Sequence, residues 1–405
     1  MNRIVCERPP RRFAPPLLYQ EGNVVWLSAL LISSVLLGFF GCAEAKTEPP
    51  AAQSRPAADT IPAVLKDSWD VYVAKFIQKD GRVIDYKASG VTTSEGQAYA
   101  MLRAVWVGDR PTFDKTFLWA KNNLNSGIRN DSLWAWKWGE GSDKRWRVLD
   151  EAFATDADQD AALALILASI VWNNRNYAEH AHLMLRDLWS QATVEVGGHR
   201  YLLAGDSLCQ RNVCRINPSY YAPYAYRIFG SFDKSRPWNS LVDSSYNVLQ
   251  IVSGFADTKL PADWVQLNRT NGQISPGTLK DSKFSYDAFR VYWRVALDRD
   301  LFHEARAAAY LDQTLRWLSS AWSKDHKLAA SISKTGKPLV EYESLEMLSG
   351  LAPALKDQAM FKRLESSYSN GVWADKDSYY LQNWAWFGTA LYRGYLGPFE
   401  LVRSR

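Results

Sequence analysis

Cysteine and histidine are both scarce in this chain, and their scarcity limits the metal chemistry that it can support. There are four cysteines and five histidines among 405 residues. No two cysteines have the spacing of a metal site, and His180 and His182, two positions apart in a predicted helix, do not converge on one ion. The sequence therefore predicts no metal site, and we expect no cofactor.

Charge of one sign is not concentrated anywhere in the sequence. Lys and Arg number 48 against 43 Asp and Glu, which gives a net charge of +5. Nucleic-acid-binding proteins normally carry a basic stripe or patch, and no such cluster occurs in this sequence. We therefore expect no nucleic-acid partner.

Long hydrophobic runs are limited to one segment near the amino terminus. Residues 1–23 form a short basic region, and residues 24–42 follow without a charge. The length of this apolar segment lies between that of a signal-peptide core and that of a transmembrane helix. It is therefore an export signal or a membrane anchor, and three fates stay open: a lipoprotein site at Gly41-Cys42, cleavage at Ala43-Glu44-Ala45, or retention as an anchor.

Each of these fates places the rest of the chain outside the cytoplasm, in the periplasm or the medium. We expect contact with a membrane only through the amino-terminal segment. In such an oxidising compartment Cys209 and Cys214, which bracket a short loop, could form a disulfide. A pair of free thiols is the alternative.

The remainder of the chain is predicted to be a single, mostly helical domain. Residues 43–62 are rich in Ala and Pro and have the composition of a flexible linker. From Ala63 onward helical patterns follow one another, and little alternates as a strand would. The predicted helices cover 64–78, 97–107, 113–124, 158–172, 177–192, 239–253, 286–298, 303–322, 341–353 and 383–395.

Aromatic residues, in contrast to cysteine, are abundant. The chain has 18 Trp, 20 Tyr and 16 Phe. They fit either a large apolar core or a sugar-binding cleft, where flat rings stack on the apolar faces of glucose units. The segment 133–139 allows the same two interpretations. Trp134, Trp136 and Trp138 stand at every second position, as in a strand that packs on a core, but their rings could also stack on a sugar.

One stretch, residues 154–172, combines acidic and apolar residues in an unusual order. It opens with Asp156, Asp158 and Asp160 and is then almost wholly apolar. Thr155 and Asp158 have the spacing of a capping pair, so we expect a helix to begin here. A helix that is apolar on every side is buried all round. Acidic residues at the start of such a helix either cap the helix or have a chemical role.

This stretch resembles the signature of glycoside hydrolase family 8. The resemblance rests on the pattern A-T-D-A-D-x-x-x-A-x-A-L-I-x-A-x-x-x-W, and further matches extend from about residue 63 to about 395. Ala161 departs from the family's usual Ile or Met, which affects packing rather than chemistry. The resemblance implies an (α/α)6 barrel as one catalytic domain over residues 63–400. It also implies inverting cleavage of β-1,4-linked glucans and related polysaccharides.

Glu95 lies in the first turn of a predicted helix. Thr92 stands three residues before it, which is a capping-box spacing and by itself explains an acid here. The segment S-E-G-Q-A-Y-A-M, however, resembles the one that carries the family's general acid. A helix start lowers a carboxyl pKa, so burial or a nearby carboxylate must raise the pKa of Glu95 for that role.

Other matches to the family supply the remaining predicted site residues. Asp156 corresponds to an acid that contacts the sugar next to the cleaved bond, and Asp158 and Asp160 are expected to cap or to form salt bridges. Trp136 is expected to stack on a sugar. Tyr220 is expected to stack on or hydrogen-bond to glucan, although a turn fixed by Pro218 with buried tyrosines is the structural alternative.

The segment F-S-Y-D-A-F-R at residues 284–290 resembles the family motif that contains the general base. The resemblance makes Asp287 the base that activates water, with Tyr286 and Arg290 beside it. Ser285 is a natural N-cap, which would place Asp287 in the first helical turn. An Asp287–Arg290 pair closed for stability is the alternative. Tyr380 is expected at the rim of the cleft, before the last inner helix.

These residues predict an endo-acting, inverting β-1,4-glucanase of the cellulase type. In a barrel of helical hairpins the inner helices run parallel, so Glu95, Asp156 and Asp287 can meet at one end. Chitosan, xylan and mixed-linkage glucan stay open as substrates. Tyr292 and the run at residues 113–124 resemble members linked to bacterial cellulose synthesis, so a synthase or export complex is a possible partner. The non-catalytic alternative is a glucan-binding or structural component of such a complex.

Overall fold

The computed structural model describes residues 61–368, 372 and 377–403, which belong to one compact unit. Six largely buried helices form its inner ring, and each packs against the next until the last meets the first. They are α2 (Ser94–Val107), α4 (Thr155–Val171), α6 (Pro223–Phe232), α8 (Phe289–Phe302), α11 (Leu345–Leu355) and α13 (Tyr379–Tyr392).

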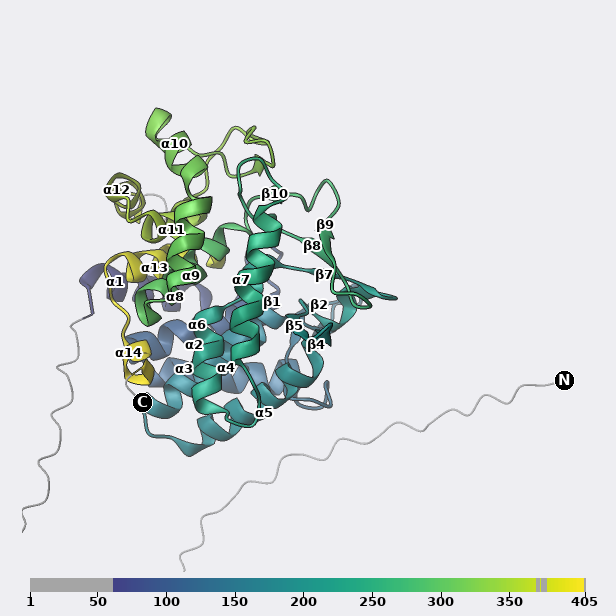
Figure 1. Cartoon of the computed structure of the whole chain (residues 1–405). Helices are drawn as coiled ribbons and strands as arrows, with labels where there is room; N and C mark the ends of the chain where they lie inside the picture. The colour runs from purple at the N-terminus through teal and green to yellow at the C-terminus, as the bar shows by residue number, and fades with distance from the viewer. Residues whose placement is uncertain (1–60, 369–371, 373–376, 404–405) are drawn as a thin grey trace, which may run out of the picture. The chain divides into compact units, whose positions relative to one another are not determined.

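An outer layer of six helices covers this ring, one for each inner helix (Figure 1). The outer helices, in the order of their inner partners, are α3 (Arg110–Ala120), α5 (Arg175–Gln191), α7 (Asn239–Ser253), α9 (Ala305–Thr314), α12 (Gln358–Ser366) and α1 (Ala63–Phe76). The predicted (α/α)6 barrel is therefore confirmed, and α1 closes it by packing on α13 at the far end of the sequence.

The two layers differ in the pattern of their buried residues. In α4, fourteen consecutive residues from Thr155 to Ala168 are buried, as expected for a helix surrounded by others. In α5, buried residues recur at Tyr177, Ala181, Met184, Leu185 and Leu188, which is one face of an amphipathic helix. An inner helix thus buries side chains on all its faces, whereas an outer helix buries only the face that packs on the inner ring.

Several helix predictions need correction. The helix predicted over 303–322 is broken at Leu315 into α9 and α10 (Arg316–Asp325), and α3 ends in a π-helical turn, η1 (Lys121–Asn125). Helices α6, α12 and α14 (Pro398–Arg403) were not predicted. Helix α6 is rich in aromatic residues, which favour strands, and α12 and α14 are short.

Short strands, hardly predicted from the sequence, lead into the starts of inner helices. The sheet β1-β2-β3 comprises Thr92–Thr93, Ala135–Glu140 and Trp146–Phe153, and its edges run directly into α2 and α4. The sheet β6-β7-β8-β9 comprises Cys209–Gln210, Val213–Ile216, Val265–Asn268 and Ile274–Pro276. The pairs β4-β5 (Thr193–Val196, His199–Leu202) and β10-β11 (Lys283–Phe284, Ile332–Ser333) complete the set. Most of these strands lie towards the right-hand side of Figure 1.

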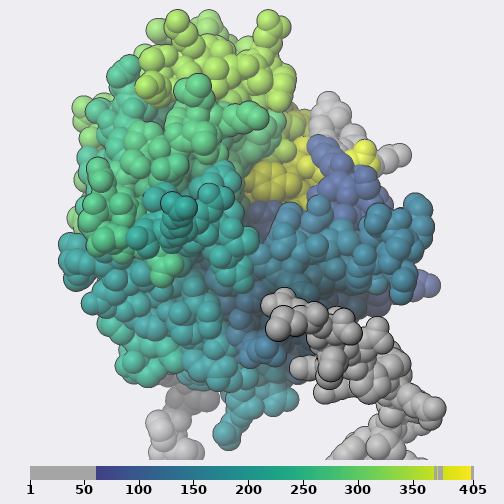
Figure 2. All heavy atoms as spheres, turned by 90° about the vertical axis from the view of Figure 1, so that its right-hand side faces the viewer, coloured from purple at the N-terminus to yellow at the C-terminus, as the bar shows by residue number. Residues whose placement is uncertain are grey.

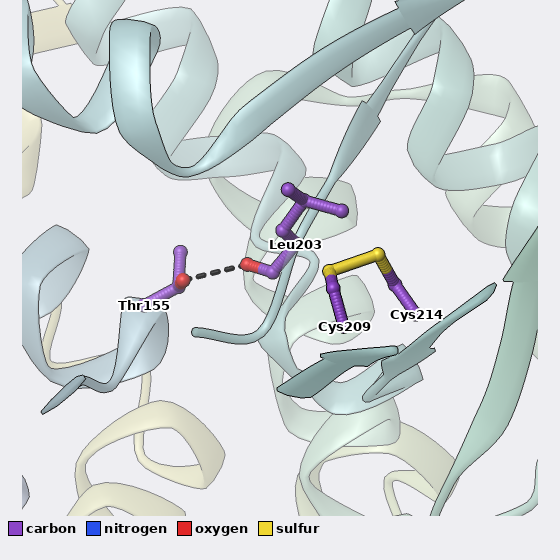
Figure 3. Close-up of a disulfide and its surroundings, with 4 residues drawn as sticks. All are labelled: Thr155, Leu203, Cys209 and Cys214. Atoms are coloured by element: carbon purple, nitrogen blue, oxygen red, sulfur yellow. Dashed lines mark hydrogen bonds between the residues drawn. A yellow bond between two sulfur atoms is a disulfide. The ribbon is translucent and has the colours of Figure 1, made fainter. Parts of the chain in front are cut away.

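Cys209 and Cys214 face each other across the β6–β7 hairpin and are joined by a disulfide (Figure 3). Nearby, the hydroxyl of Thr155 at the start of α4 donates to the carbonyl of Leu203 over 2.6 Å. The hydrogen bond ties the segment that follows β5 to the start of an inner helix.

Two glycines allow inner helices to approach closely. A Cβ at Gly388 in α13 would lie 2.2 Å from the carbonyl oxygen of Ser349 in α11, and one at Gly350 in α11 would lie 2.5 Å from the ring of Phe289 in α8. No side chain fits at either distance, so α8, α11 and α13 pack with backbone in contact.

The described residues contain no helix long and apolar enough to cross a membrane. They also contain no cluster of His, Cys, Asp and Glu that could hold a metal ion. The predictions for the basic region, the apolar segment and most of the linker concern residues 1–60, which lie outside the described residues.

Candidate active site

Glu95 stands at the start of α2 but does not cap the helix. Thr93 is the N-cap and accepts from the amide of Gly96 over 3.1 Å, so the capping box expected with Thr92 is absent. The Glu95 carboxyl accepts from the hydroxyl of Tyr379 at Oε1 over 2.8 Å and from that of Tyr99 at Oε2 over 3.2 Å.

The environment of Glu95 resolves the conflict between its helix position and the role of an acid. Burial raises the pKa of Glu95 to about 7, and the nearby Asp156 adds to this rise. Arg290 and the hydroxyls of Tyr379 and Tyr99 oppose it without cancelling it. The side chain still keeps 19% of its surface exposed, so a bound molecule can reach it.

The start of α4 is held differently from the prediction. Its N-cap is Ala154, which makes no side-chain cap, and Thr155 is already helical. Asp158 does not cap the helix either, because its Oδ1 accepts from the backbone amide of Trp134 over 2.9 Å. Asp160 forms a buried two-point pair with Arg294, with distances of 3.1 and 2.8 Å.

Asp156 is the member of this acidic trio that turns towards the other predicted acids. Its side chain is 4% exposed, and its Oδ2 accepts from Nη1 of Arg290 over 3.0 Å. Burial raises the pKa of Asp156, and the positive charge of Arg290 opposes that rise. Asp156 is therefore held against Arg290 with little contact with solvent.

Asp287 lies in the turn that precedes α8, not in the first turn of the helix. The helix begins at Phe289, and Ser285 is not its N-cap. The N-cap is Ala288, which makes no side-chain cap. Asp263, in a separate loop, holds the turn before the helix, since its Oδ1 accepts from the amides of Ser285 and Ala288 over 3.0 and 2.9 Å.

The Asp287 carboxyl has one donor on each oxygen. Oδ1 accepts a short hydrogen bond from Nη2 of Arg290, and Oδ2 accepts from the indole nitrogen of Trp264 over 2.9 Å. The side chain is 31% exposed. It is thus fixed in orientation and still accessible to water.

Arg290 joins the three predicted acids. Its Nη1 donates to Glu95 over 3.1 Å and to Asp156 over 3.0 Å, and its Nη2 donates to Asp287. The side chain is 2% exposed, and its guanidinium lies 5.3 Å from the ring centre of Tyr220. The prediction paired Arg290 with Asp287 alone, but the structure brings all three carboxyl groups to one guanidinium.

The predicted sugar-contacting aromatics fall into two groups. Tyr220, at the end of η3 (Pro218–Tyr220), packs against Arg290, and the hydroxyl of Tyr380 donates to the carbonyl of Tyr286 over 2.7 Å. These three residues therefore surround the acids. The second group is Trp136, which is half-buried on β2 at an irregularity in the pairing with β3, with the ammonium of Lys137 5.4 Å from its ring centre.

The part of the molecule that carries the strands is not flat. Figure 2 shows the face at the right-hand side of Figure 1, which is hollowed between the yellow carboxy-terminal part, the teal and green middle and the blue segment.

Four residues near the acids were missed or underused by sequence reasoning. Tyr99 could have been found, because position i+4 from Glu95 lies on the same face of α2. Tyr379, the neighbour of the predicted Tyr380, opens α13 and contacts Glu95. Asp263 and Trp264 lie in a loop without a periodic pattern, so no local signal connected them with Asp287.

Carboxyl groups gathered at the end of the barrel where inner helices start are the chemical groups that glycoside hydrolases use, since these enzymes cleave with paired carboxyls. Residues 51–334 match the family model "Glycosyl hydrolases family 8". The chain belongs to this family, as its motifs predicted.

Relatives in the family agree with this assignment. An endoglucanase of Escherichia coli (strain K12) is 34% identical over 258 residues, which cover 62% of this chain and 66% of that protein. One of Pseudomonas fluorescens (strain SBW25) is 35% identical over 239 residues, which cover 55% and 58%. The matches thus span 66% and 58% of these relatives' lengths, in both cases less than two thirds.

Solved structures extend the similarity over more of the fold. The endo-1,4-D-glucanase of Vibrio fischeri ES114 superposes with a TM-score of 0.72 at 26% identity, covering 81% of this chain and 94% of that one. A family 8 endoglucanase of Klebsiella pneumoniae gives 0.68 at 25% identity, covering 81% and 99%.

Proposed function

We propose that this protein is an endo-acting, inverting glycoside hydrolase that cleaves β-1,4-linked glucan. The observation that carries the proposal is the junction at Arg290, where Glu95, Asp156 and Asp287 meet at one guanidinium. Glycosidases need one carboxyl that holds a proton and another that accepts one. Here burial raises the pKa of Glu95 to about 7, which suits the first role at neutral pH.

In the proposed reaction Glu95 gives its proton to the glycosidic oxygen as the bond from that oxygen to the anomeric carbon breaks. A water molecule attacks the same carbon from the opposite face, and Asp287 takes a proton from this water. Asp156 hydrogen-bonds to the distorted sugar and supports the positive charge that develops on it. Inversion requires the acid and base carboxyls about 6.5–9.5 Å apart, so that water fits between them.

The aromatic side chains around the acids support a polysaccharide substrate. Tyr286 is 40% exposed, and Tyr220 and Tyr380 are partly exposed beside Arg290 and Glu95. Exposed flat rings beside the acids suit the apolar faces of a glucan chain, and the hollowed face in Figure 2 suits the binding of such a chain. An open hollow also suits cleavage within a chain rather than at its end. The names of the family relatives favour a β-1,4-glucan.

The test is reducing-end release from carboxymethyl-cellulose by the wild type, Glu95→Gln and Asp287→Asn. We expect each variant to lose roughly 10²–10⁴-fold in rate. Glu151→Gln, at an exposed position on β3, is the matched control and should keep wild-type activity. Near-normal rates in Glu95→Gln or Asp287→Asn would reject the assigned roles. Proton NMR of the first product distinguishes inversion from retention by the anomer that forms.

Substrate choice and turnover are tested in the same series. Release from chitosan, xylan or mixed-linkage glucan, but not from carboxymethyl-cellulose, would replace the substrate and keep the mechanism. Tight glucan binding without release from any polysaccharide would favour the non-catalytic component of an export complex. Co-purification with a cellulose synthase would support that partner.

We also propose that the protein acts outside the cytoplasm. The apolar segment at residues 24–42 supports export, and the Cys209–Cys214 disulfide suits an oxidising compartment. Cell fractionation with detection of the mature amino terminus tests this proposal. Recovery of the uncleaved chain in the cytoplasm would contradict it.

A further inference from the structure

Two neighbouring residues outside the predicted motifs hold the turn that carries Asp287. Asp263 and Trp264 directly precede β8. The indole nitrogen of Trp264 donates to Oδ2 of Asp287 over 2.9 Å. Asp263 is 4% exposed and accepts from the amides of Ser285 and Ala288 and from the Ser285 hydroxyl. These two residues therefore bind both the backbone of the turn and the carboxyl group of Asp287.

The orientation of the Trp264 ring is itself fixed by its neighbours. Its ring centre lies 5.8 Å from that of Tyr220 in an edge-on contact, and 4.7 Å from the guanidinium of Arg215 on β7. Residue 264 leads into β8, which is paired with β7 on one side and β9 on the other. The four-stranded sheet, which is not part of the helical barrel, thus fixes the backbone next to Trp264 and with it the direction of the indole N–H.

We infer that Asp263 and Trp264 are positioning residues for the general base, with Asp263 fixing the turn and Trp264 fixing the plane of the Asp287 carboxyl. The inference rests on the proposed role of Asp287. Arg290 on Oδ1 and Trp264 on Oδ2 together prevent the carboxyl from rotating. The attacking water molecule would then always find the Asp287 carboxyl in the same orientation.

The kinetic test is Trp264→Phe, which keeps a ring and removes the N–H. We expect kcat to fall roughly 10–10²-fold with little change in KM, because the base is misplaced. Trp238→Phe is the matched control, because the Trp238 indole also donates to a carboxylate, Asp233, over 3.1 Å. Equal kinetics for the two variants would overturn the inference.

The role of Asp263 is tested by a pair of substitutions. Asp263→Asn keeps an oxygen that can accept from the two amides, and it should retain most of the wild-type kcat. Asp263→Ala removes every acceptor and should lower kcat as Trp264→Phe does. Loss of kcat in Asp263→Ala with an unchanged melting temperature supports positioning. Wild-type kcat in a folded Asp263→Ala overturns the part assigned to this residue.

A measurement that needs no turnover separates this inference from the proposed function. In protein labelled with ¹⁵N-tryptophan, the resonance absent from Trp264→Phe identifies the Trp264 indole. We expect this resonance to move in Asp287→Asn, because the indole N–H then loses its carboxylate partner. If the wild type cleaves no glycan yet the resonance moves in Asp287→Asn, the proposed function fails and the contact remains. A resonance that does not respond to Asp287→Asn overturns the inference.

Discussion

The Nη1 nitrogen of Arg290 donates to Oε2 of Glu95 over 3.1 Å, although 195 residues separate the two in the chain. The same guanidinium binds Asp156 and Asp287. A charge that is 2% exposed interacts strongly with its partners, because little water screens it. Arg290 therefore sets the relative positions of the proposed acid and base.

Arg290→Lys should lower kcat roughly 10²-fold or more, although it keeps the positive charge. The planar guanidinium reaches Glu95 and Asp287 from two different nitrogens, and a single ammonium cannot reproduce that geometry. Steady-state kinetics on the substrate that the wild type cleaves measure the loss.

Arg294→Lys is the control for this prediction. Arg294 lies one turn further along α8, is equally buried and makes a two-point pair with Asp160. Its replacement should lower the melting temperature and leave kcat close to the wild type. If both variants lost the same activity, the effect of Arg290→Lys would reflect general damage to α8.

Tyr379→Phe should move the basic limb of the kcat/KM profile to higher pH. The Tyr379 hydroxyl donates to Glu95 over 2.8 Å and thereby lowers its pKa, while burial sets that pKa at about 7. Without the donor the charged form is less favoured, so the acid keeps its proton to higher pH, by up to about one unit. Activity is measured from about pH 4 to about pH 10, at the pH values where the protein stays folded, and the profile locates the basic limb.

Tyr221→Phe serves as the matched variant. Its hydroxyl is also buried, but it contacts the backbone of Leu202 and not Glu95. The basic limb should stay at the wild-type position in this variant. A basic limb that fails to rise in Tyr379→Phe would show that another group than Glu95 sets it.

The sequence was most informative about this site where a motif and a helix start coincide. Glu95 and Asp156 each lie in a helix whose start was predicted within a few residues, and the structure brings both to Arg290. Local spacing gave a wrong prediction where a residue from a separate loop contacts the start of the helix. Ser285 is a residue type that favours the N-cap, but in the structure its amide and its hydroxyl both donate to the carboxyl of Asp263, and the helix begins four residues later.

The fold was predictable for a similar reason. Inner helices such as α4 are buried on every side and leave a continuous apolar pattern that the sequence displays. The short strands leave none, because a two-residue strand such as β1 has no periodicity to read. The closure of the ring by α1 on α13 joins the two ends of the domain and could come only from the family resemblance.

Asp158→Asn should leave the protein at least as stable as the wild type at pH 7. Burial raises the pKa of Asp158 well above its usual range, and its Oδ2 has no hydrogen-bond partner among the described residues. The folded state then holds a proton that the unfolded state has lost, so stability falls as pH rises above about 4. Asn keeps the acceptor for Trp134 and removes that dependence.

Asp160→Asn, two residues away, should behave in the opposite way. It leaves the buried Arg294 without its charged partner, which typically costs about 3–5 kcal/mol. Urea unfolding of both variants at pH 5 and pH 8 measures the difference. A large loss of stability at pH 8 in Asp158→Asn would mean that Asp158 is ionised in the folded state.

Gly388→Ala should destabilise the barrel by about 1–3 kcal/mol, even though Ala is the better helix former. The added methyl group would lie 2.2 Å from the backbone oxygen of Ser349, and a helix backbone cannot yield as a flexible side chain can. Gly230→Ala in α6 is the matched control, because its new methyl group would meet nothing nearer than 3.5 Å. That variant should be neutral or slightly stabilised, and urea midpoints compare the two. Equal midpoints would show that α11 and α13 can separate enough to admit a methyl group, and the close approach of these helices would then not be required for the closed ring.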